Sequence, residues 1–355
     1  MSVLTSLVVA GAMVVGAPGS VTFTLPKPGG WAEVGTTTVH LGDPARKDPW
    51  KPDRQRELMV TLWYPARDTK DYPKAKWTTA GVTPFLDGLG ASLGIPKLDW
   101  AGADTDGHEG APASGKRPVV LYSPGSSAPR FTGTVLAEEL ASQGYIVVTM
   151  DHTYETAVEF PGGRVEWPVR FDATTALQAR VADTRFVLDR LADIARGRNP
   201  DAEGKALPRG LDMDLTRVGM FGHSMGGFTA GEAMVVDRRI DVGANLDGGM
   251  PGGEITKSGV DGPFLLVGGS YTEDGTPQDH THATDPSWAD FWAHQQRWKR
   301  DILVKGAGHY SFTDLQAILP QLQGTWTPLI GTIDPNRSLA TQKAILRHFF
   351  ECFLH

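Results

Sequence analysis

The chain has 355 residues, of which 40% are hydrophobic and 21% are charged, and its formal net charge at pH 7 is −7. This composition is ordinary for a soluble globular protein, and the length is ample for a full hydrophobic core. The acidic balance, together with the lack of any long lysine or arginine cluster, excludes nucleic acid as a partner.

The N-terminal segment has the pattern of an export signal. Residues 3–17 are apolar and uncharged, which is the length of a signal-peptide hydrophobic region and too short for a membrane span. The positively charged start of a complete signal is missing, since no lysine or arginine precedes Lys27. We predict a partial signal peptide at residues 1–19 and a secreted protein. A buried N-terminal strand and a cytoplasmic location are the alternatives.

The cysteine content leaves the compartment open. Cys352 is the single cysteine, so an intrachain disulfide is excluded. It belongs to an amphipathic pattern at the C-terminus, which predicts a packed core thiol and not a reactive one.

Two kinds of pattern alternate along the chain. Residues 37–42 and 57–65 are rich in β-branched side chains and predict an antiparallel pair of strands. Continuous apolar runs predict buried strands at 117–125, 145–151, 218–222, 241–247, 263–269 and 302–309. Helical spacing predicts helices at 135–144, 174–196, 228–236 and about 339–354. Strands alternating with helices indicate an α/β fold, in which helices cover both faces of a mostly parallel central sheet.

The domain organisation follows from this alternation. We predict a single domain over residues 20–355, with helical insertions near 79–100 and 275–298. In such a sheet, the loops at the carboxyl ends of the parallel strands carry the chemistry. The candidate catalytic residues follow such strand ends.

Residues 222–226 carry the strongest local motif. Gly222-His223-Ser224-Met225-Gly226 fits G-x-S-x-G, with an apolar strand before it and a helical segment after it. A sharp strand-to-helix turn exposes the serine oxygen, and the crowded backbone at that turn requires glycine on both sides. We predict that Ser224 is a nucleophile.

A serine hydroxyl needs a base, which a histidine downstream of it can supply. His309 follows a predicted strand, and glycines on its N-terminal side allow a loop to bring its imidazole over Ser224. The rival histidines lie in polar or helical segments: His280, His282, His294, His348 and His355. His223 is expected to pack or hydrogen-bond beside the serine.

The third group must accept a hydrogen bond from His309 and stay ionised. Asp247 comes directly at a strand end, whereas Asp274 lies several residues out in a polar loop after the next strand. A rigid position suits a group that orients an imidazole, which favours Asp247. Asp274 remains the alternative candidate for the acid.

An oxyanion hole needs two backbone N–H donors near the serine. Met225, directly after the nucleophile, is one candidate. The other is Ser126, in the loop after the strand at 117–125, because Pro124 has no N–H.

The chain resembles the plasma-type platelet-activating-factor acetylhydrolase family of α/β-hydrolases, especially its secreted actinobacterial members. The matching segments occur in the family's order and cover roughly residues 35 to 315: LWYP (62–65), LYSPGSS (121–127), LASQGYIVVTMDH (140–152), VGMFGHSMGG (218–227), NLDGGMP (245–251) and GAGHYSFTD (306–314). The resemblance implies an α/β-hydrolase fold. It also implies that Asp247, in an LD-x-x-M motif, is the acid.

Two positions depart from the family's pattern. Pro124 stands where the oxyanion loop usually has histidine, which affects the polarity expected of the pocket more than the donor at Ser126. Met225 stands where the family often has an aromatic residue.

These residues predict a serine ester hydrolase with an acyl-enzyme intermediate and no cofactor or metal. His280 and His282 have a His-x-His spacing, which is expected to be a polar surface loop and not a metal site.

The substrate is predicted to be a small-molecule or lipid ester with a short acyl group, or a phospholipid-like ester. Residues 83–96 have one apolar helical face, for which core packing and contact with a lipid interface both stay open. Tentative pocket residues are His152, Trp288 and Trp292, with a structural or core role as the alternative for each.

Two other functions remain as alternatives. A polyester or cutin hydrolase is one, because actinobacterial cutinases share the G-H-S-M-G-G motif, although they are shorter and typically carry a disulfide. A non-catalytic binding protein on a hydrolase scaffold is the other, but such proteins usually lose one member of the triad.

Overall fold

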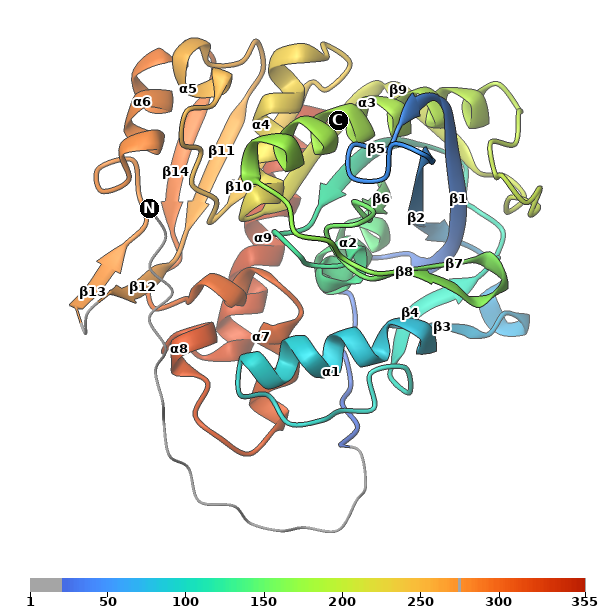
Figure 1. The fold of residues 1–355 in the computed structure, drawn as a ribbon, viewed down its shortest axis with the longest axis horizontal. Coiled ribbons are helices and arrows are strands. Elements are labelled where there is room, and N and C mark those ends of the chain that lie inside the picture. Colours follow the sequence, from blue (N-terminus) through green and yellow to red (C-terminus); the bar gives the residue numbers. More distant parts are fainter. Residues whose placement is uncertain (1–20, 274–275, 355) are drawn as a thin grey trace.

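The computed structural model describes residues 21–273 and 276–354. Within them, ten strands form one sheet (Figure 1). Six adjacent strands are parallel, in the order β14 (Lys299–Leu303), β11 (Phe264–Gly268), β10 (Val242–Leu246), β9 (Asp212–His223), β5 (Lys116–Ser123) and β6 (Ile146–Met150). The predicted leader at residues 1–19 and the rival acid Asp274 lie outside the described residues.

The rest of the sheet is mixed. Its strands follow β6 in the order β2 (Gln55–Ala66), β1 (Glu33–Lys47), β4 (Asp104–Glu109) and β3 (Lys74–Lys76). β1 and β2 pair antiparallel, as the alternating sequence predicts. Two hairpins stand apart from the sheet: β7 (Val158–Phe160) with β8 (Arg164–Glu166), and β12 (Ser270–Glu273) with β13 (Thr276–Asp279).

Helices cover both faces of the sheet, and each face has its own apolar core. One core holds side chains of α3 (Ala173–Ala195), α4 (Met225–Val236), α5 (Glu254–Ser258) and α6 (Pro286–His294). The other holds side chains of α2 (Thr134–Ser142) and α9 (Pro335–Leu354). The Asp172 carboxylate caps the start of α3 by accepting a hydrogen bond from the Thr175 N–H at 2.8 Å.

A third apolar cluster, which we call the cap, joins segments far apart in the sequence. It contains α1 (Thr83–Ser92), α7 (Leu315–Ile318) and α8 (Thr327–Ile330), and Figure 1 shows α1 close to α7 and α8. Short 3-10 turns complete the chain: η1 (Thr69–Asp71), η2 (Ala80–Val82), η3 (Arg130–Gly133), η4 (Pro161–Gly163), η5 (His309–Phe312) and η6 (Leu319–Gln321). Because side chains of α1 belong to this apolar cluster, the apolar side of α1 faces the protein.

Three details differ from the sequence-based expectation. β14 ends at Leu303, so the residues before His309 form a turn and not a strand. The last helix begins at Pro335, four residues earlier than predicted. Cys352 is exposed, because it lies on the outer side of α9.

Within residues 21–273 and 276–354, no helix combines the length and apolar character that crossing a bilayer requires.

Candidate active site

Ser224 occupies the sharp turn between β9 and α4. Its backbone has φ 54° and ψ −124°, a conformation that is rare for a residue other than glycine. The turn is held by the Ser224 N–H, which donates to the Leu246 carbonyl at 2.8 Å. A Cβ on Gly226 would lie 1.9 Å from the Ser123 carbonyl oxygen, so only glycine fits there. The turn that the motif predicts is therefore formed.

Asp247 follows the adjacent strand β10 directly. It also has a positive φ of 59°, and its N–H donates to the Val267 carbonyl at 2.8 Å. The Gly269 N–H donates to Asp247 Oδ1 at 2.8 Å. The carboxylate is thus fixed between the ends of β10 and β11.

His309 begins η5, and its imidazole meets Asp247. His309 Nδ1 lies 2.6 Å from Asp247 Oδ2, and because a carboxylate only accepts, Nδ1 is the donor. The His309 side chain is 39% exposed and that of Asp247 is 4% exposed, so one end of the pair is open to substrate and the other is enclosed.

His280 is a second imidazole on the same carboxylate, which sequence reasoning did not find. Its Nδ1 lies 2.9 Å from Asp247 Oδ1, and its Nε2 lies 3.5 Å from the Asp285 carboxylate. Burial acts to lower the pKa of His280, but the two carboxylates outweigh it and raise that pKa to about 9. Burial likewise acts to raise the pKa of Asp247, but hydrogen bonds from His280 and His309 lower it well below its usual range.

Two cavities meet at Ser224. The first, of about 290 Å³, is lined by Ser224 and His309 and by apolar residues of the cap, including Trp77, Leu86, Leu89, Leu93 and Tyr310. The second, of about 830 Å³, is a groove between α3 and α4 whose lining includes Leu177, Val181, Ser224, Met225 and Phe228.

No hydrogen bond joins the Ser224 hydroxyl to His309 in the described part of the chain. Such contacts often form only when substrate binds.

Ser126 and Met225 both border the groove beside Ser224. Met225 is the first residue of α4, where a helix leaves its N–H groups without intrahelical acceptors. Gly125, just before Ser126, lies against the nucleophile, since a Cβ on it would be 3.5 Å from Ser224 Cβ. The two predicted oxyanion donors therefore flank the serine.

His223 contacts both the backbone and the ring of His309. Its Nε2 donates to the His309 backbone carbonyl at 2.9 Å, and the two rings lie 4.5 Å apart. Burial lowers the pKa of His223 to about 3, so this imidazole is neutral. The expected hydrogen-bonding role of His223 fits these contacts.

His152 does not line the substrate cavities, which corrects the tentative prediction. It is 1% exposed and lies between the Ser123 hydroxyl, 2.9 Å from Nε2, and the Asp183 carboxylate, 2.9 Å from Nδ1. These partners draw the side chain beneath the loop that follows β5. The structural alternative is the one that the geometry supports.

Trp288 and Trp292 likewise border neither cavity at Ser224. Trp288 is fully buried, stacks on His280 with ring centroids 4.0 Å apart, and donates to the Gly248 carbonyl at 2.7 Å. Trp292 stacks on His282, also at 4.0 Å. Both side chains pack against the core beneath α6, which fits the alternative core role of these residues and not a substrate wall.

His282 makes a 2.6 Å contact with the Asp301 carboxylate. Among the described residues, no group of three or more His, Cys, Asp or Glu side chains has the arrangement of a metal site.

Comparison with known proteins identifies the family. The family model described as platelet-activating factor acetylhydrolase, isoform II, matches residues 20–160 and 173–353. The probable 1-alkyl-2-acetylglycerophosphocholine esterase of Arthroderma benhamiae is 30% identical over 370 residues, covering 93% of this chain and 88% of that protein. The platelet-activating factor acetylhydrolase of Cavia porcellus is 25% identical over 340 residues, covering 88% and 73%.

A solved structure extends the comparison to the fold. The ferulic acid esterase from Streptomyces cinnamoneus is 36% identical and superposes with a TM-score of 0.75, covering 94% of this chain and 93% of that one. The predicted α/β-hydrolase fold is confirmed, and so is the family resemblance. The chain belongs to the platelet-activating factor acetylhydrolase isoform II family and is a carboxylic ester hydrolase.

Proposed function

We propose that this hydrolase works through a catalytic triad of Ser224, His309 and Asp247, with an acyl-enzyme intermediate. The observation that carries the proposal is the 2.6 Å contact between His309 Nδ1 and Asp247 Oδ2, in a site where His309 shares a cavity with the strained Ser224. This arrangement supplies a nucleophile, a base and an ionised group that orients the base.

In the first half of the cycle, Ser224 Oγ attacks the ester carbonyl carbon while His309 Nε2 takes the hydroxyl proton. The Asp247 carboxylate holds Nδ1–H and stabilises the imidazolium that forms. Negative charge develops on the carbonyl oxygen, and the N–H groups of Ser126 and Met225 donate to it. The tetrahedral intermediate then expels the alcohol, which receives its proton from His309.

In the second half, water replaces the alcohol. His309 Nε2 takes a proton from this water as it attacks the acyl carbon, and the same two N–H groups stabilise the second oxyanion. Collapse breaks the bond to Ser224 Oγ, which recovers its proton from His309. The products are a carboxylic acid and free enzyme.

We infer the roles of the two cavities from the position of His309. The leaving alcohol must lie near His309, because this residue protonates it, and of the two cavities at Ser224 it is the one below the cap that His309 lines. The acyl group then extends into the groove between α3 and α4, which both Ser126 and Met225 border. The cap cavity is apolar along α1, which suits the alkyl part of a lipid alcohol.

We propose a phospholipid-like ester with a short acyl group as the substrate class. The names of the family and of its relatives in Arthroderma benhamiae and Cavia porcellus support this class. The proposal includes export through residues 1–19 and a single domain over residues 20–355. For residues 83–96, the apolar packing of α1 against α7 and α8 favours the core role over contact with a lipid surface.

An ester of a larger, aromatic acid is the second candidate. The groove on the acyl side has a volume of about 830 Å³, far more than an acetyl group requires. The similar structure from Streptomyces cinnamoneus is named a ferulic acid esterase, which supports the same reading.

A substrate panel separates the candidates. The kcat/KM values are measured for 1-alkyl-2-acetyl-glycerophosphocholine, methyl ferulate, p-nitrophenyl esters of increasing acyl length and a polyester film, with Ser224→Ala as the blank. Highest kcat/KM for the acetyl phospholipid supports the first candidate, and highest kcat/KM for methyl ferulate supports the second. Activity on the film alone would support the polyester alternative.

A further inference from the structure

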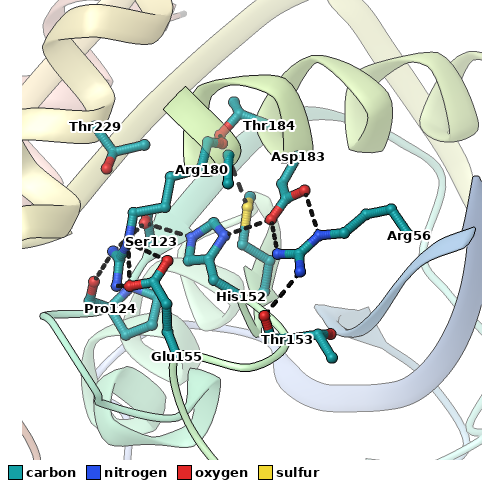
Figure 2. Close-up of polar contacts among 12 residues, drawn as sticks. Arg56, Ser123, Pro124, His152, Thr153, Glu155, Arg180, Asp183, Thr184 and Thr229 are labelled. Atoms are coloured by element: carbon teal, nitrogen blue, oxygen red, sulfur yellow. Dashed lines mark hydrogen bonds and ion pairs between the residues drawn. The ribbon is translucent and has the colours of Figure 1, made fainter. Parts of the chain in front are cut away.

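Behind the loop that follows β5, a network of charged and polar side chains fills the space next to α3 (Figure 2). Its members are each at most 1% exposed: Arg56, Ser123, His152, Glu155, Arg180 and Asp183. None of them belongs to the proposed triad or supplies an oxyanion donor. Buried ion pairs are often no more stabilising than apolar residues of similar volume, so stability alone does not account for this network.

Arg180 is the member that contacts the loop. From the first half of α3 it donates to two successive backbone carbonyls, with Nη1 2.6 Å from the Pro124 oxygen and Nη2 3.0 Å from the Gly125 oxygen. Figure 2 shows its guanidinium beside Pro124 and Ser123. The Gly125 oxygen also accepts from the Ala128 N–H at 3.1 Å.

The Gly125 carbonyl and the Ser126 N–H belong to one peptide group. A trans peptide is planar and its C=O and N–H point in opposite directions, and no peptide in the described residues is cis. Holding the Gly125 oxygen toward Arg180 therefore turns the Ser126 N–H away from α3. Ser126 lines both cavities beside Ser224, so the direction of its N–H decides whether that N–H can reach an oxyanion formed there.

Glu155 fixes the orientation of the guanidinium. Arg180 Nε lies 3.0 and 2.9 Å from the two carboxylate oxygens of Glu155, and Nη2 lies 2.7 Å from one of them. Because the guanidinium is planar and rigid, this forked contact also sets the direction of the N–H groups that reach the loop.

A second chain of contacts holds the start of the same loop. The Ser123 hydroxyl lies 3.3 Å from Arg180 Nη1 and 2.9 Å from His152 Nε2, and His152 Nδ1 donates to the Asp183 carboxylate. Burial lowers the pKa of His152, so the ring is neutral and Nε2 accepts a hydrogen bond from the Ser123 hydroxyl. Ser123 is fully buried, so this serine, histidine and aspartate support the loop and do not attack substrate.

We propose that Arg180, held by Glu155, is a positioning residue of the oxyanion hole, which fixes the peptide between Gly125 and Ser126 so that the Ser126 N–H faces the substrate oxygen. The proposal rests on the proposed catalytic function. It predicts that loss of the Arg180 contacts weakens binding of the transition state more than binding of the substrate.

Two variants test this role. Arg180→Lys keeps the charge but removes the fork, and the double variant Arg180→Met with Glu155→Met removes the whole ion pair without leaving an unpaired charge. For each folded variant we expect kcat to fall about 10²-fold, as when one oxyanion donor is lost, with KM changed far less. The inhibition constant of a trifluoromethyl ketone, which mimics the tetrahedral intermediate, should rise by a similar factor.

Arg56→Lys is the matched control. Arg56 is equally buried and pairs with Asp183 and Asp48, but it donates to the Thr153 carbonyl and to no carbonyl of residues 124–126. We expect this variant to lose stability in urea without the 10²-fold loss of kcat. Wild-type kcat and inhibitor affinity in folded Arg180→Lys, or an equal loss of kcat in Arg56→Lys, would overturn the proposal. Failure of the catalytic function itself would be recognised separately, by the absence of Ser224 labelling in the wild type.

Discussion

His280 and Asp247 form a buried contact of 2.9 Å on the carboxylate oxygen that His309 does not use. With the Gly269 N–H, three donors surround this one carboxylate. Burial acts to raise the pKa of Asp247, but the hydrogen bonds and charges of His280 and His309 favour the ionised form and lower it. These contacts therefore keep the Asp247 carboxylate ionised and fix its orientation.

The first prediction concerns the acid. Asp247→Asn should lower kcat by about 10³- to 10⁴-fold, because an amide no longer holds the His309 tautomer that accepts the serine proton. Steady-state hydrolysis of p-nitrophenyl acetate measures this loss. Asp274→Asn is the matched control and should stay close to wild type. Near-normal turnover in Asp247→Asn would refute the assignment.

The second prediction concerns pH. The pKa of His280 is raised to about 9 from a usual value of 6.5, by Asp247 first and by Asp285. A raised histidine pKa stabilises the folded state below pH 6.5, and this contribution is lost as pH rises through about 9. At 1.4 kcal/mol for each pKa unit, it amounts to roughly 3 kcal/mol.

His280→Asn removes this contribution. The free energy of unfolding in urea should be lower than wild type at pH 6, and the two proteins should converge near pH 9.5. His294→Asn, at an exposed histidine of α6, is the control and should follow the wild-type pH curve. A constant difference between His280→Asn and wild type from pH 6 to 9.5 would contradict a charged His280.

The third prediction compares two helical glycines. Replacing glycine by alanine in a helix normally stabilises it by about 1 kcal/mol, and Gly88→Ala in α1 should do so because a Cβ there meets nothing within 4 Å. Gly226→Ala should instead destabilise the protein by about 1–3 kcal/mol, since its Cβ would lie 1.9 Å from the Ser123 carbonyl. Urea unfolding of both variants is the measurement. Equal stabilisation would mean that the turn at Ser224 is looser than described.

The fourth prediction tests the assignment of the cavities. Leu177→Trp narrows the groove between α3 and α4, and it should lower kcat/KM for octanoyl esters at least about tenfold relative to acetyl esters, a difference of 1.4 kcal/mol. Leu89→Trp narrows the cap cavity and should instead change the preference among alcohols at a fixed acyl group. If the two variants exchange these effects, the acyl and alcohol sides are reversed.

Local patterns were sufficient for the central strands of the sheet and for the turn at Ser224, but they did not predict the edge strands β3 and β4. The turn at Ser224 depends on neighbours within a few residues, so its motif carries the geometry. Local patterns were not sufficient to identify Asp247 as the acid. A strand end marks a rigid position, but it does not show which histidine the carboxylate contacts. The family motif supplied the choice between Asp247 and Asp274.

The residues that sequence reasoning misplaced depend on distant partners. His152 ends a strand beside the site, but the Asp183 carboxylate, 31 positions away, draws it under the loop. His280 contacts Asp247, which lies 33 positions before it in the sequence, because the end of β13 lies beside the end of β11. Trp288 stacks on that same His280, which buries it in α6 packing. No periodicity encodes such contacts.

The most direct test of the triad is covalent labelling of the active protein. The wild type is incubated with a fluorophosphonate probe, residual hydrolysis of p-nitrophenyl acetate is followed, and the adduct is mapped by peptide mass spectrometry, with Ser224→Ala in parallel. We expect one adduct on Ser224, formed as activity is lost, and no adduct in the variant. Loss of activity with the label on another residue, or full hydrolysis by Ser224→Ala, would contradict the proposed catalytic role of Ser224.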